Sequence, residues 1–184
     1  SPISEFVSAP KVSPVLPPAD LASIAYPKNK AALKLAPRDF KGSFCDRHAE
    51  LGDAGAALVY YAARIRCRSK MKLALLLGYD GPVKVWIDGR EVFHDPKGTN
   101  PANIDKARVP FDAAKGEHEV LVALDSNKGN AWGIYLRFQR LDIGRKTSYR
   151  WEELPETVRE VVSKGVEEVS SMSARAVSGR KKKR

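Results

Sequence analysis

The chain has 184 residues, of which 43% are hydrophobic, and a formal net charge of +10. This length is enough for one domain with its own core, and the apolar fraction is that of an ordinary globular protein. No apolar run approaches the ~18–20 residues of a membrane-spanning helix, so no membrane span is predicted. The first residues, SPISEF, lack the basic start and apolar stretch of a secretory signal. We interpret residues 1–20, which are rich in proline, as an extended lead-in or a remnant of cloning.

The positive charge is concentrated at the end of the chain. Residues 174–184 contain six Lys and Arg side chains and no acid, and removing these six charges from +10 leaves +4. Such a basic tail could contact phosphate, an acidic polysaccharide or an anionic membrane, or it could simply be solvated. An excess confined to a tail argues against nucleic acid as the partner of the rest of the chain.

Cys45 and Cys67 are the two cysteines. As a disulfide they would close a loop of about 22 residues and stabilise the fold by roughly 3 kcal/mol in an oxidising compartment. They could equally be two small buried thiols. Neither belongs to a CxxC pair, so no zinc site is predicted.

Regular structure is predicted to begin near residue 56, after loops. The segment AALVYYAARIRC (56–67) alternates, which indicates a strand with one half-exposed face, and KMKLALLLGY (70–79) is nearly all apolar, which is typical of a central strand. Residues 118–125 (HEVLVALD) and 131–141 (AWGIYLRFQRL) are predicted as two later strands, after a long polar loop.

Two Asp-Gly pairs delimit the strands between these segments. The segment PVKVWID (82–88) alternates, with its valines and isoleucine on one face and Trp86 on the other. Asp88-Gly89 is the pair most favoured in type I′ hairpins, because both residues tolerate a positive φ, and residues 90–94 return as the partner strand. Asp80-Gly81 would turn the chain in the same way, so residues 70–94 are predicted to form a three-stranded antiparallel meander.

Six strands separated by turns, with no helical period between them, predict an all-β antiparallel sandwich or barrel over residues 21–145. The segment 146–173 differs, because apolar residues recur there at spacings of three and four from Trp151 to Met172. This pattern predicts an amphipathic C-terminal helix. The helix could pack on the sandwich or connect to another part of a larger protein.

The hairpin and the later strands resemble a known family. The segments GYDGPVKVWIDGREVFHD and KGEHEVLVALDSNKGNAWGIYLRFQ are similar to the galactose-binding-like jelly-roll modules of bacterial polysaccharide-degrading and surface proteins. In those modules a D-G turn leads into a V-K-V-W hairpin, and a loop ending in W-G precedes the last strand. A weaker likeness, through the same hairpin, is to PA14-type sandwiches. The match covers about residues 56–140.

The resemblance implies an antiparallel jelly-roll β-sandwich without catalytic activity. Such modules are often appended to a glycoside hydrolase, sulfatase or esterase, and they hold a polysaccharide or glycan through loops at one rim. It also implies an extracellular, periplasmic or cell-surface location, with neighbouring domains of a larger protein as partners. Because many such modules are spacers, a purely structural or protein-interaction sandwich without a sugar ligand is the alternative.

Sugar recognition needs a flat apolar ring against C–H faces and short polar groups that pair with hydroxyls. The candidate ligand residues at strand ends or in loops are Tyr79, Asp80, His94, Asn127, Asn130 and Trp132. Trp86 is a separate candidate, because it lies on the face of its strand opposite the valines and the isoleucine. The two tryptophans could instead be core residues, and both Asp80 and Asp88 could act mainly as turn formers.

A structural calcium ion is the one cofactor that the sequence suggests. Asp95, Asn100, Asn103 and Asp105 lie in one loop and supply oxygen ligands, although their spacing is not that of an EF-hand. The same residues could be solvated loop residues.

Catalytic motifs are absent from the sequence. His48, His94 and His118 are the three histidines, and none belongs to an HExxH motif. The sequence also lacks a GxSxG elbow, a P-loop and a GxGxxG fingerprint, so no enzymatic activity is predicted.

Overall fold

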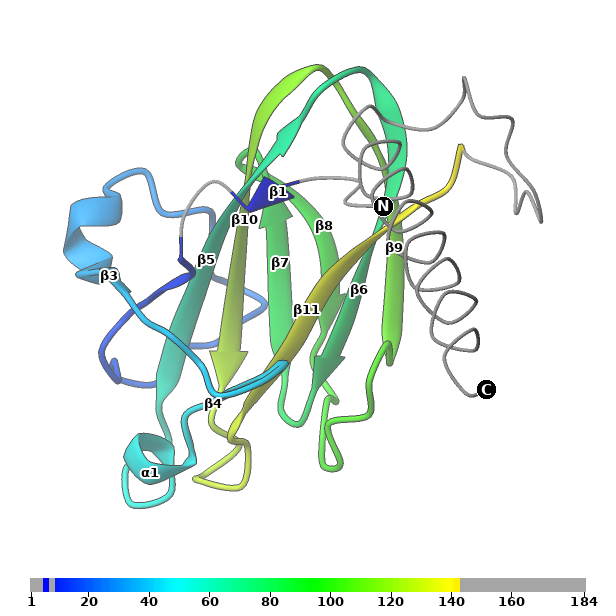
Figure 1. Cartoon of the computed structure of the whole chain (residues 1–184). Coiled ribbons are helices and arrows are strands. Elements are labelled where there is room, and N and C mark those ends of the chain that lie inside the picture. Colours follow the sequence, from blue (N-terminus) through cyan, green and yellow to red (C-terminus); the bar gives the residue numbers. More distant parts are fainter. Residues whose placement is uncertain (1–4, 7–8, 143–184) are drawn as a thin grey trace, which may run out of the picture. The chain divides into compact units, whose positions relative to one another are not determined.

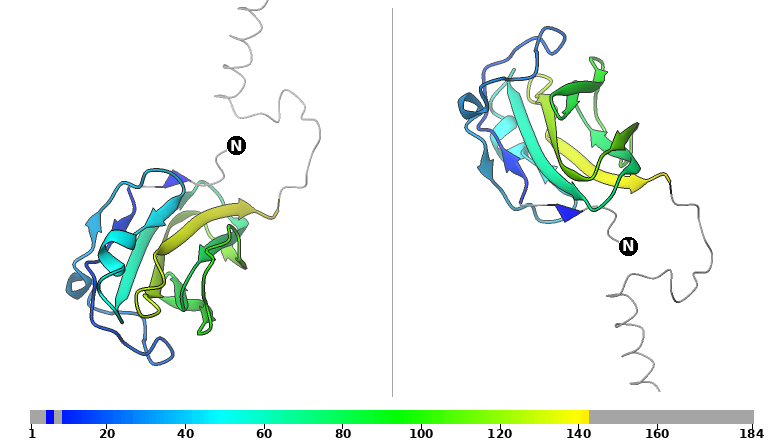
Figure 2. Two further views of the ribbon diagram at one scale, coloured as in Figure 1. Left: turned by 90° about the horizontal axis from the view of Figure 1, so that it is seen from below. Right: turned by 90° about the horizontal axis from the view of Figure 1, so that it is seen from above.

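The computed structural model describes residues 5–6 and 9–142 (Figure 1). These residues form two antiparallel β-sheets that pack face to face, as the end-on views in Figure 2 show. Within this range, no helix has the length and apolar character needed to cross a bilayer. The helix predicted within 146–173 and the basic tail 174–184 lie outside the described residues.

The larger sheet has seven strands, in the order β3-β2-β5-β10-β7-β8, with β1 also paired to β5. Their bounds are β1 Glu5–Phe6, β2 Lys11–Val12, β3 Ala36–Pro37, β5 Leu58–Cys67, β7 Val83–Ile87, β8 Arg90–Asp95 and β10 Gly116–Asp125. The smaller sheet has the order β4-β11-β6-β9, and its strands are β4 Phe44–Asp46, β6 Met71–Tyr79, β9 Ala107–Ala113 and β11 Gly133–Arg140. Two short helices, η1 (Lys30–Leu33) and α1 (His48–Leu51), lie in the connections.

The prediction of an all-β antiparallel sandwich is confirmed, and each of the six predicted strands is present. The strand β9 was not predicted, because Pro110 interrupts it. Proline lacks an N–H group and is tolerated only where no ladder bond is needed. This condition is met here because β9 is an edge strand that pairs only with β6.

The prediction of a three-stranded meander is wrong. Strand β6 belongs to the four-stranded sheet and β7 to the seven-stranded sheet, so Asp80-Gly81 carries the chain from one sheet to the other. The β7–β8 hairpin is confirmed, and Asp88 and Gly89 have φ values of 51° and 81°, as a type I′ turn requires. An Asp-Gly pair therefore marks a sharp turn, but it does not decide whether the flanking strands pair.

The main core lies between the two sheets. On β7, Val83 and Val85 have no exposed surface and Ile87 is 6% exposed, and all three face the four-stranded sheet through the main hydrophobic cluster. Alternation along β7 therefore predicted the inward face correctly.

A second cluster lies on the opposite, outer face of the seven-stranded sheet. Trp86 is 2% exposed there, and it packs with Leu33, Tyr60 and Leu121 beneath the N-terminal segment. The prediction that Trp86 contacts a ligand is therefore corrected, because the indole is covered by this chain's own residues. The covering segment comes from the part of the chain that was expected to be loops.

Lys84 holds this N-terminal segment in place. Its ammonium group is buried and donates hydrogen bonds to the carbonyl oxygens of Leu21 (3.1 Å), Ala22 (3.4 Å) and Ile24 (2.9 Å), and it pairs with Glu91 at 3.1 Å. A buried ammonium group is tolerated only with such a full set of acceptors. Of the residues before position 21 that the structure describes, Glu5–Phe6 (β1) and Lys11–Val12 (β2) join the sheet by pairing with β5.

The two cysteines are free thiols, so the disulfide alternative is wrong. Cys45 pairs in register with Ile134 in the four-stranded sheet, whereas Cys67 lies opposite Gly116 at the far end of the seven-stranded sheet. The ten-residue strand β5 spans roughly 30 Å between these ends, far beyond the reach of a disulfide. Burial raises the pKa of Cys45 to about 11, so it stays a protonated thiol.

His118 connects the β7–β8 hairpin to the start of β10. Its Nδ1 lies 2.6 Å from a carboxylate oxygen of Asp88, and its Nε2 lies 2.9 Å from the carbonyl oxygen of Ala114. Burial opposes the charged imidazolium, but these two bonds outweigh it and raise the pKa of His118. A raised pKa in the folded state means that proton binding stabilises the fold below the unfolded pKa of about 6.5, and that this contribution is lost as pH rises through the folded pKa.

We therefore predict that His118→Gln costs more stability at about pH 5.5 than at about pH 8.5, because only the protonated histidine makes a charged pair with Asp88. Urea unfolding of both proteins at the two pH values measures the difference. Equal costs at the two pH values would contradict the charged pair.

Candidate functional site

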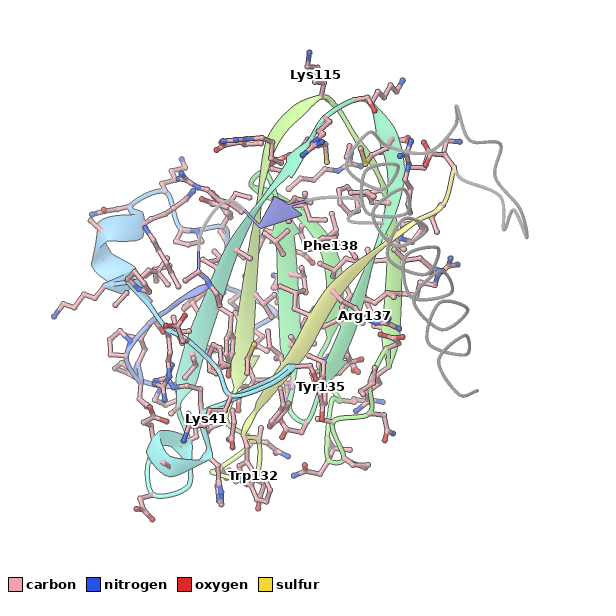
Figure 3. The ribbon with its side chains drawn as sticks, in the orientation of Figure 1. Lys41, Lys115, Trp132, Tyr135, Arg137 and Phe138 are labelled. Atoms are coloured by element: carbon pink, nitrogen blue, oxygen red, sulfur yellow. The ribbon has the colours of Figure 1, made fainter. Side chains whose placement is uncertain are left out.

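Four connections meet at one end of the sandwich, which is the lower end in Figure 1. They are α1 with its flanks (46–55), the crossing from β6 to β7 (79–82), the loop from β8 to β9 (96–106) and the loop from β10 to β11 (126–132). We call these four segments the loop rim. Figure 3 places Trp132 at this end and Lys115 at the opposite end of the sandwich.

The carboxylate of Asp80 joins two segments of the loop rim. It is 1% exposed and accepts hydrogen bonds from the backbone N–H groups of Trp132 (3.0 Å) and Gly133 (3.1 Å), one on each oxygen. Burial raises the pKa of this carboxyl, and the two backbone bonds partly oppose that rise. Asp80 is thus a brace that sets the position of the backbone at Trp132, rather than a ligand contact.

Trp132 is 39% exposed, unlike Trp86. Its ring stacks on His48 of α1, with the ring centroids 4.0 Å apart and an interplanar angle of 30°. The Trp132 carbonyl oxygen accepts a 2.7 Å hydrogen bond from the N–H of Arg47, which ties α1 to the same residue. Asp80 therefore fixes the backbone of Trp132, and His48 stacks on the indole ring itself.

The contribution of His48 was not predicted. Asp46 accepts a 2.8 Å hydrogen bond from the N–H of His48 and so stabilises the first turn of α1. An aspartate two residues before a short apolar-polar run is a signal for a helix start. It does not reveal that the helix will meet a loop more than eighty residues later in the chain.

Asparagine side chains connect the two long loops. Asn100 donates from its side-chain amide to the carbonyl oxygen of Asn130, and Asn130 donates to the carbonyl oxygen of Asn127 at 2.9 Å. Asn127 and Lys128 both have left-handed φ values, 48° and 58°, and Asp125 accepts the N–H of Asn127 at 2.6 Å. These bonds make the 126–132 loop a tight, internally bonded turn beside the 96–106 loop.

Tyr79 supports the loop rim from inside. It is 3% exposed, and its hydroxyl donates to Asp95 at 2.7 Å. Lys106 lies 4.6 Å above the ring and donates to the carbonyl oxygens of Tyr79 (3.2 Å) and Thr99 (2.7 Å). Burial and the bond to Asp95 raise the pKa of Tyr79, so it remains a phenol that donates.

The structure thus brings five of the predicted ligand residues to one place and separates two. Those at the loop rim are Tyr79, Asp80, Asn127, Asn130 and Trp132. Of these, Trp132 and Asn130 are exposed, Asn127 is half-buried, and the other two are buried braces. His94 lies instead opposite Lys84 on β8, near Asp20, and Trp86 lies under the N-terminal segment.

The carboxylates of the predicted calcium set already have partners. Asp95 accepts from Tyr79 and from the N–H of Lys97, and Asp105 forms a two-pronged ion pair with Arg137, which lowers the pKa of that carboxyl. Among residues 5–6 and 9–142, no group of three or more acidic, histidine or cysteine side chains is placed to hold a metal ion. The calcium site stays a prediction.

The accessible surface of the loop rim combines an apolar ring, neutral polar groups and the charged side chains of Asp46, Asp53, Lys97, Lys106 and Lys128. The exposed large hydrophobic residues in the described part of the chain are Trp132 and Ile104, which is 61% exposed, and both belong to the rim. Thr99, Asn100 and Asn130, on the same loops, are also exposed. Two hollows lie away from the rim, one of about 330 Å³ beside η1 and one of about 660 Å³ between β8 and β9.

We predict that Asp80→Asn lowers the free energy of unfolding by about 1–3 kcal/mol. The amide has one acceptor oxygen, so either the Trp132 or the Gly133 N–H loses its buried acceptor. Urea unfolding measures the change, and Asp53→Asn, at an exposed position just after α1, is the matched control with a change within about 0.5 kcal/mol. Equal stabilities of the two variants would show that Asp80 is not a brace.

We also expect EDTA to leave the thermal midpoint of unfolding unchanged, because Asp95 and Asp105 are already paired. Thermal scans with EDTA, with calcium and with magnesium make the measurement. A midpoint that falls in EDTA and is restored by calcium but not by magnesium would support the calcium site instead.

No family model matches the sequence, and no curated protein matches it. Solved structures with a similar arrangement include a β-glucosidase from Kluyveromyces marxianus, with 10% identity and a TM-score of 0.48 over 73% of this chain and 16% of that one. An anti-sigma factor domain-containing protein from Clostridium clariflavum has 12% identity and a TM-score of 0.47, over 77% of this chain and 44% of that one. A PA14 sugar-binding domain from an RTX adhesin has 14% identity and a TM-score of 0.45, over 73% and 91%. This chain spans 16% of the β-glucosidase and 44% of the anti-sigma factor domain-containing protein, and similarities of this size imply nothing about its ligand.

Proposed function

We propose that this chain is a non-catalytic carbohydrate-binding module of a larger secreted or cell-surface protein, and that it holds a glycan at the loop rim. The observation that carries the proposal is the exposed, supported indole of Trp132. Trp86 is only 2% exposed, so the same sandwich can bury a tryptophan side chain. The exposure of Trp132 is therefore specific to its position at the loop rim.

The surroundings of Trp132 suit a neutral, hydroxylated ligand. An indole face covers the C–H surface of a sugar ring, and the amides of Asn100 and Asn130 offer donors and acceptors for hydroxyl groups without the cost of desolvating a charge. His48 and Asp80 already fix the ring and its backbone. Little side-chain entropy is therefore lost on binding, which favours affinity for a small ligand.

The strand order supports a galactose-binding-like jelly roll as the finer description of the sandwich. From β4 onward the chain alternates between the sheets, except at the β7–β8 hairpin, and produces the facing orders β4-β11-β6-β9 and β5-β10-β7-β8. Eight strands in two such interleaved sheets make the two Greek keys of a jelly roll. In this arrangement the loops at one end come from both sheets, which is how segments distant in sequence meet at the loop rim.

We predict that the intact chain binds a neutral polysaccharide or glycan on an array or an affinity gel, and that Trp132→Ala weakens binding by about 30-fold or more, the usual loss when a central aromatic contact is removed. Lys115→Ala, at the opposite end of the sandwich, is the matched control and should bind like the parent protein. Unfolding curves of both variants check that the fold is intact.

If the folded parent chain binds none of the neutral glycans, the alternative is favoured, which is a structural or protein-interaction sandwich without a sugar ligand. Binding that is unchanged in Trp132→Ala would place the glycan elsewhere and contradict the role of the loop rim.

A further inference from the structure

A concave surface lies on the outer face of the seven-stranded sheet, beside η1. In Figure 1, η1 is the short blue helix on the left. The concave surface has a volume of about 330 Å³, and its charged lining residues are Lys11, Lys30, Lys34, Arg64 and Glu119. The floor between them is apolar and small, because Ala62 of β5 and Leu35 after η1 lie there. We call this surface the cationic hollow.

Strand register explains why these charges meet. Lys11 of β2 lies opposite Ala62 of β5, and Glu119 of β10 lies opposite Arg64 of β5. Residues 62 and 64 are two apart, so their side chains share the outer face, and their cross-strand partners share it with them. Lys30 and Lys34, at the two ends of η1, form the remaining wall.

The cations outnumber the acid. Glu119 is engaged by Lys30 and by the hydroxyl of Tyr26 (2.6 Å), and its second oxygen lies 3.8 Å from Arg64. One carboxylate against four cations leaves an excess of three positive charges around a hollow. The side chains of Lys11 and Lys34 are exposed and form no ion pair with a carboxylate of the described residues. A concave surface concentrates such a potential and attracts an anion.

The wall that carries the lysines is fixed before any ligand arrives. Leu33 of η1 is buried in the second cluster, and Lys34 closes the helix in a left-handed conformation (φ 48°) with its N–H bonded to the carbonyl oxygen of Ala31. Tyr26 packs edge-on against Trp86 at 6.4 Å. These contacts fix the backbone from which Lys30 and Lys34 project, so a ligand has to order only the side chains themselves.

We propose that the cationic hollow binds one acidic sugar unit, a uronic acid, with its carboxylate toward Lys11, Lys34 and Arg64. Three features of the lining select this class of ligand. The cations pair with the acid group, the Ala62 and Leu35 surface contacts the carbon skeleton, and Glu119 accepts from a hydroxyl. A volume of about 330 Å³ is at the small end of ligand pockets, so it fits a single sugar unit rather than a long stretch of polymer. This site is separate from the loop rim and does not depend on the neutral-glycan proposal.

The test is isothermal titration of the full chain with a trigalacturonate, at fixed salt, in matched charge variants. The double variant Lys34→Gln/Arg64→Gln should bind at least about tenfold more weakly, because two charge-assisted bonds are lost. The double variant Lys72→Gln/Lys115→Gln removes the same charge from exposed positions outside both the hollow and the loop rim, and its affinity should change by less than about twofold. The uncharged analogue galactotriose should give no binding that depends on Lys34 and Arg64.

Three results would overturn the proposal. If the parent chain does not bind trigalacturonate, the hollow has no such ligand. If both double variants weaken binding equally, the effect is general electrostatic attraction, to which the basic residues 174–184 also contribute. If Trp132→Ala abolishes trigalacturonate binding and the Lys34/Arg64 variant retains it, the acidic sugar binds at the loop rim. This last result would be consistent with glycan binding at the loop rim, but it would reject the cationic hollow as a binding site.

Discussion

The loop rim depends on one buried carboxylate, that of Asp80. The chain crosses between the sheets at residues 80–82, and the end of the 126–132 loop returns beside it, where the backbone N–H groups of Trp132 and Gly133 both donate to Asp80. Burying those groups without an acceptor would cost more than a hydrogen bond is worth, so a residue with two acceptor oxygens is needed at the crossing. Asp80 meets this need, although burial disfavours its charge. The position of Trp132 at the surface follows directly from this interaction.

A second buried charge solves the equivalent problem on the outer face of the seven-stranded sheet. Residues 21–24 belong to no strand or helix, and three of their carbonyl groups converge on the ammonium of Lys84. The adjacent Trp86 supplies the apolar surface on which the segment rests. The two tryptophans therefore differ in role because of what lies over them. Trp86 is covered by a segment that a buried lysine anchors, whereas Trp132 lies at an end of the sandwich, where His48 stacks on it and its side chain remains 39% exposed.

The sequence predicted what depends on local periodicity and missed what depends on distant contacts. Alternation located β5, β7, β10 and the hairpin at Asp88-Gly89, because a period of two and a tolerance for positive φ are local properties. It could not say that β6 and β7 belong to different sheets, since alternation indicates which face is buried and not which strand is the partner. The cover over Trp86 was missed because residues 21–35 carry no regular pattern. At the site, Trp132 and Asn130 were identified from residue type, whereas the stacking of His48 joins residues 84 positions apart and leaves no trace in either local segment.

Both candidate sites lie on irregular segments, and in each region a buried ionisable side chain bonds such a segment to the sandwich. A loop that recognises a small ligand must lose little entropy on binding, yet loops usually have much to lose. Here each irregular segment is bonded to the sandwich through a buried ionisable side chain, Asp80 at the loop rim and Lys84 under the N-terminal segment. Lys84 lies on β7, and Asp80 directly follows β6. The segments that bond to these two side chains are therefore held in place by the sheets. The proposed ligands differ because the surroundings differ: amides beside an indole at the loop rim suit the proposed neutral sugar ring, and a net positive hollow with a small apolar floor suits the proposed sugar acid.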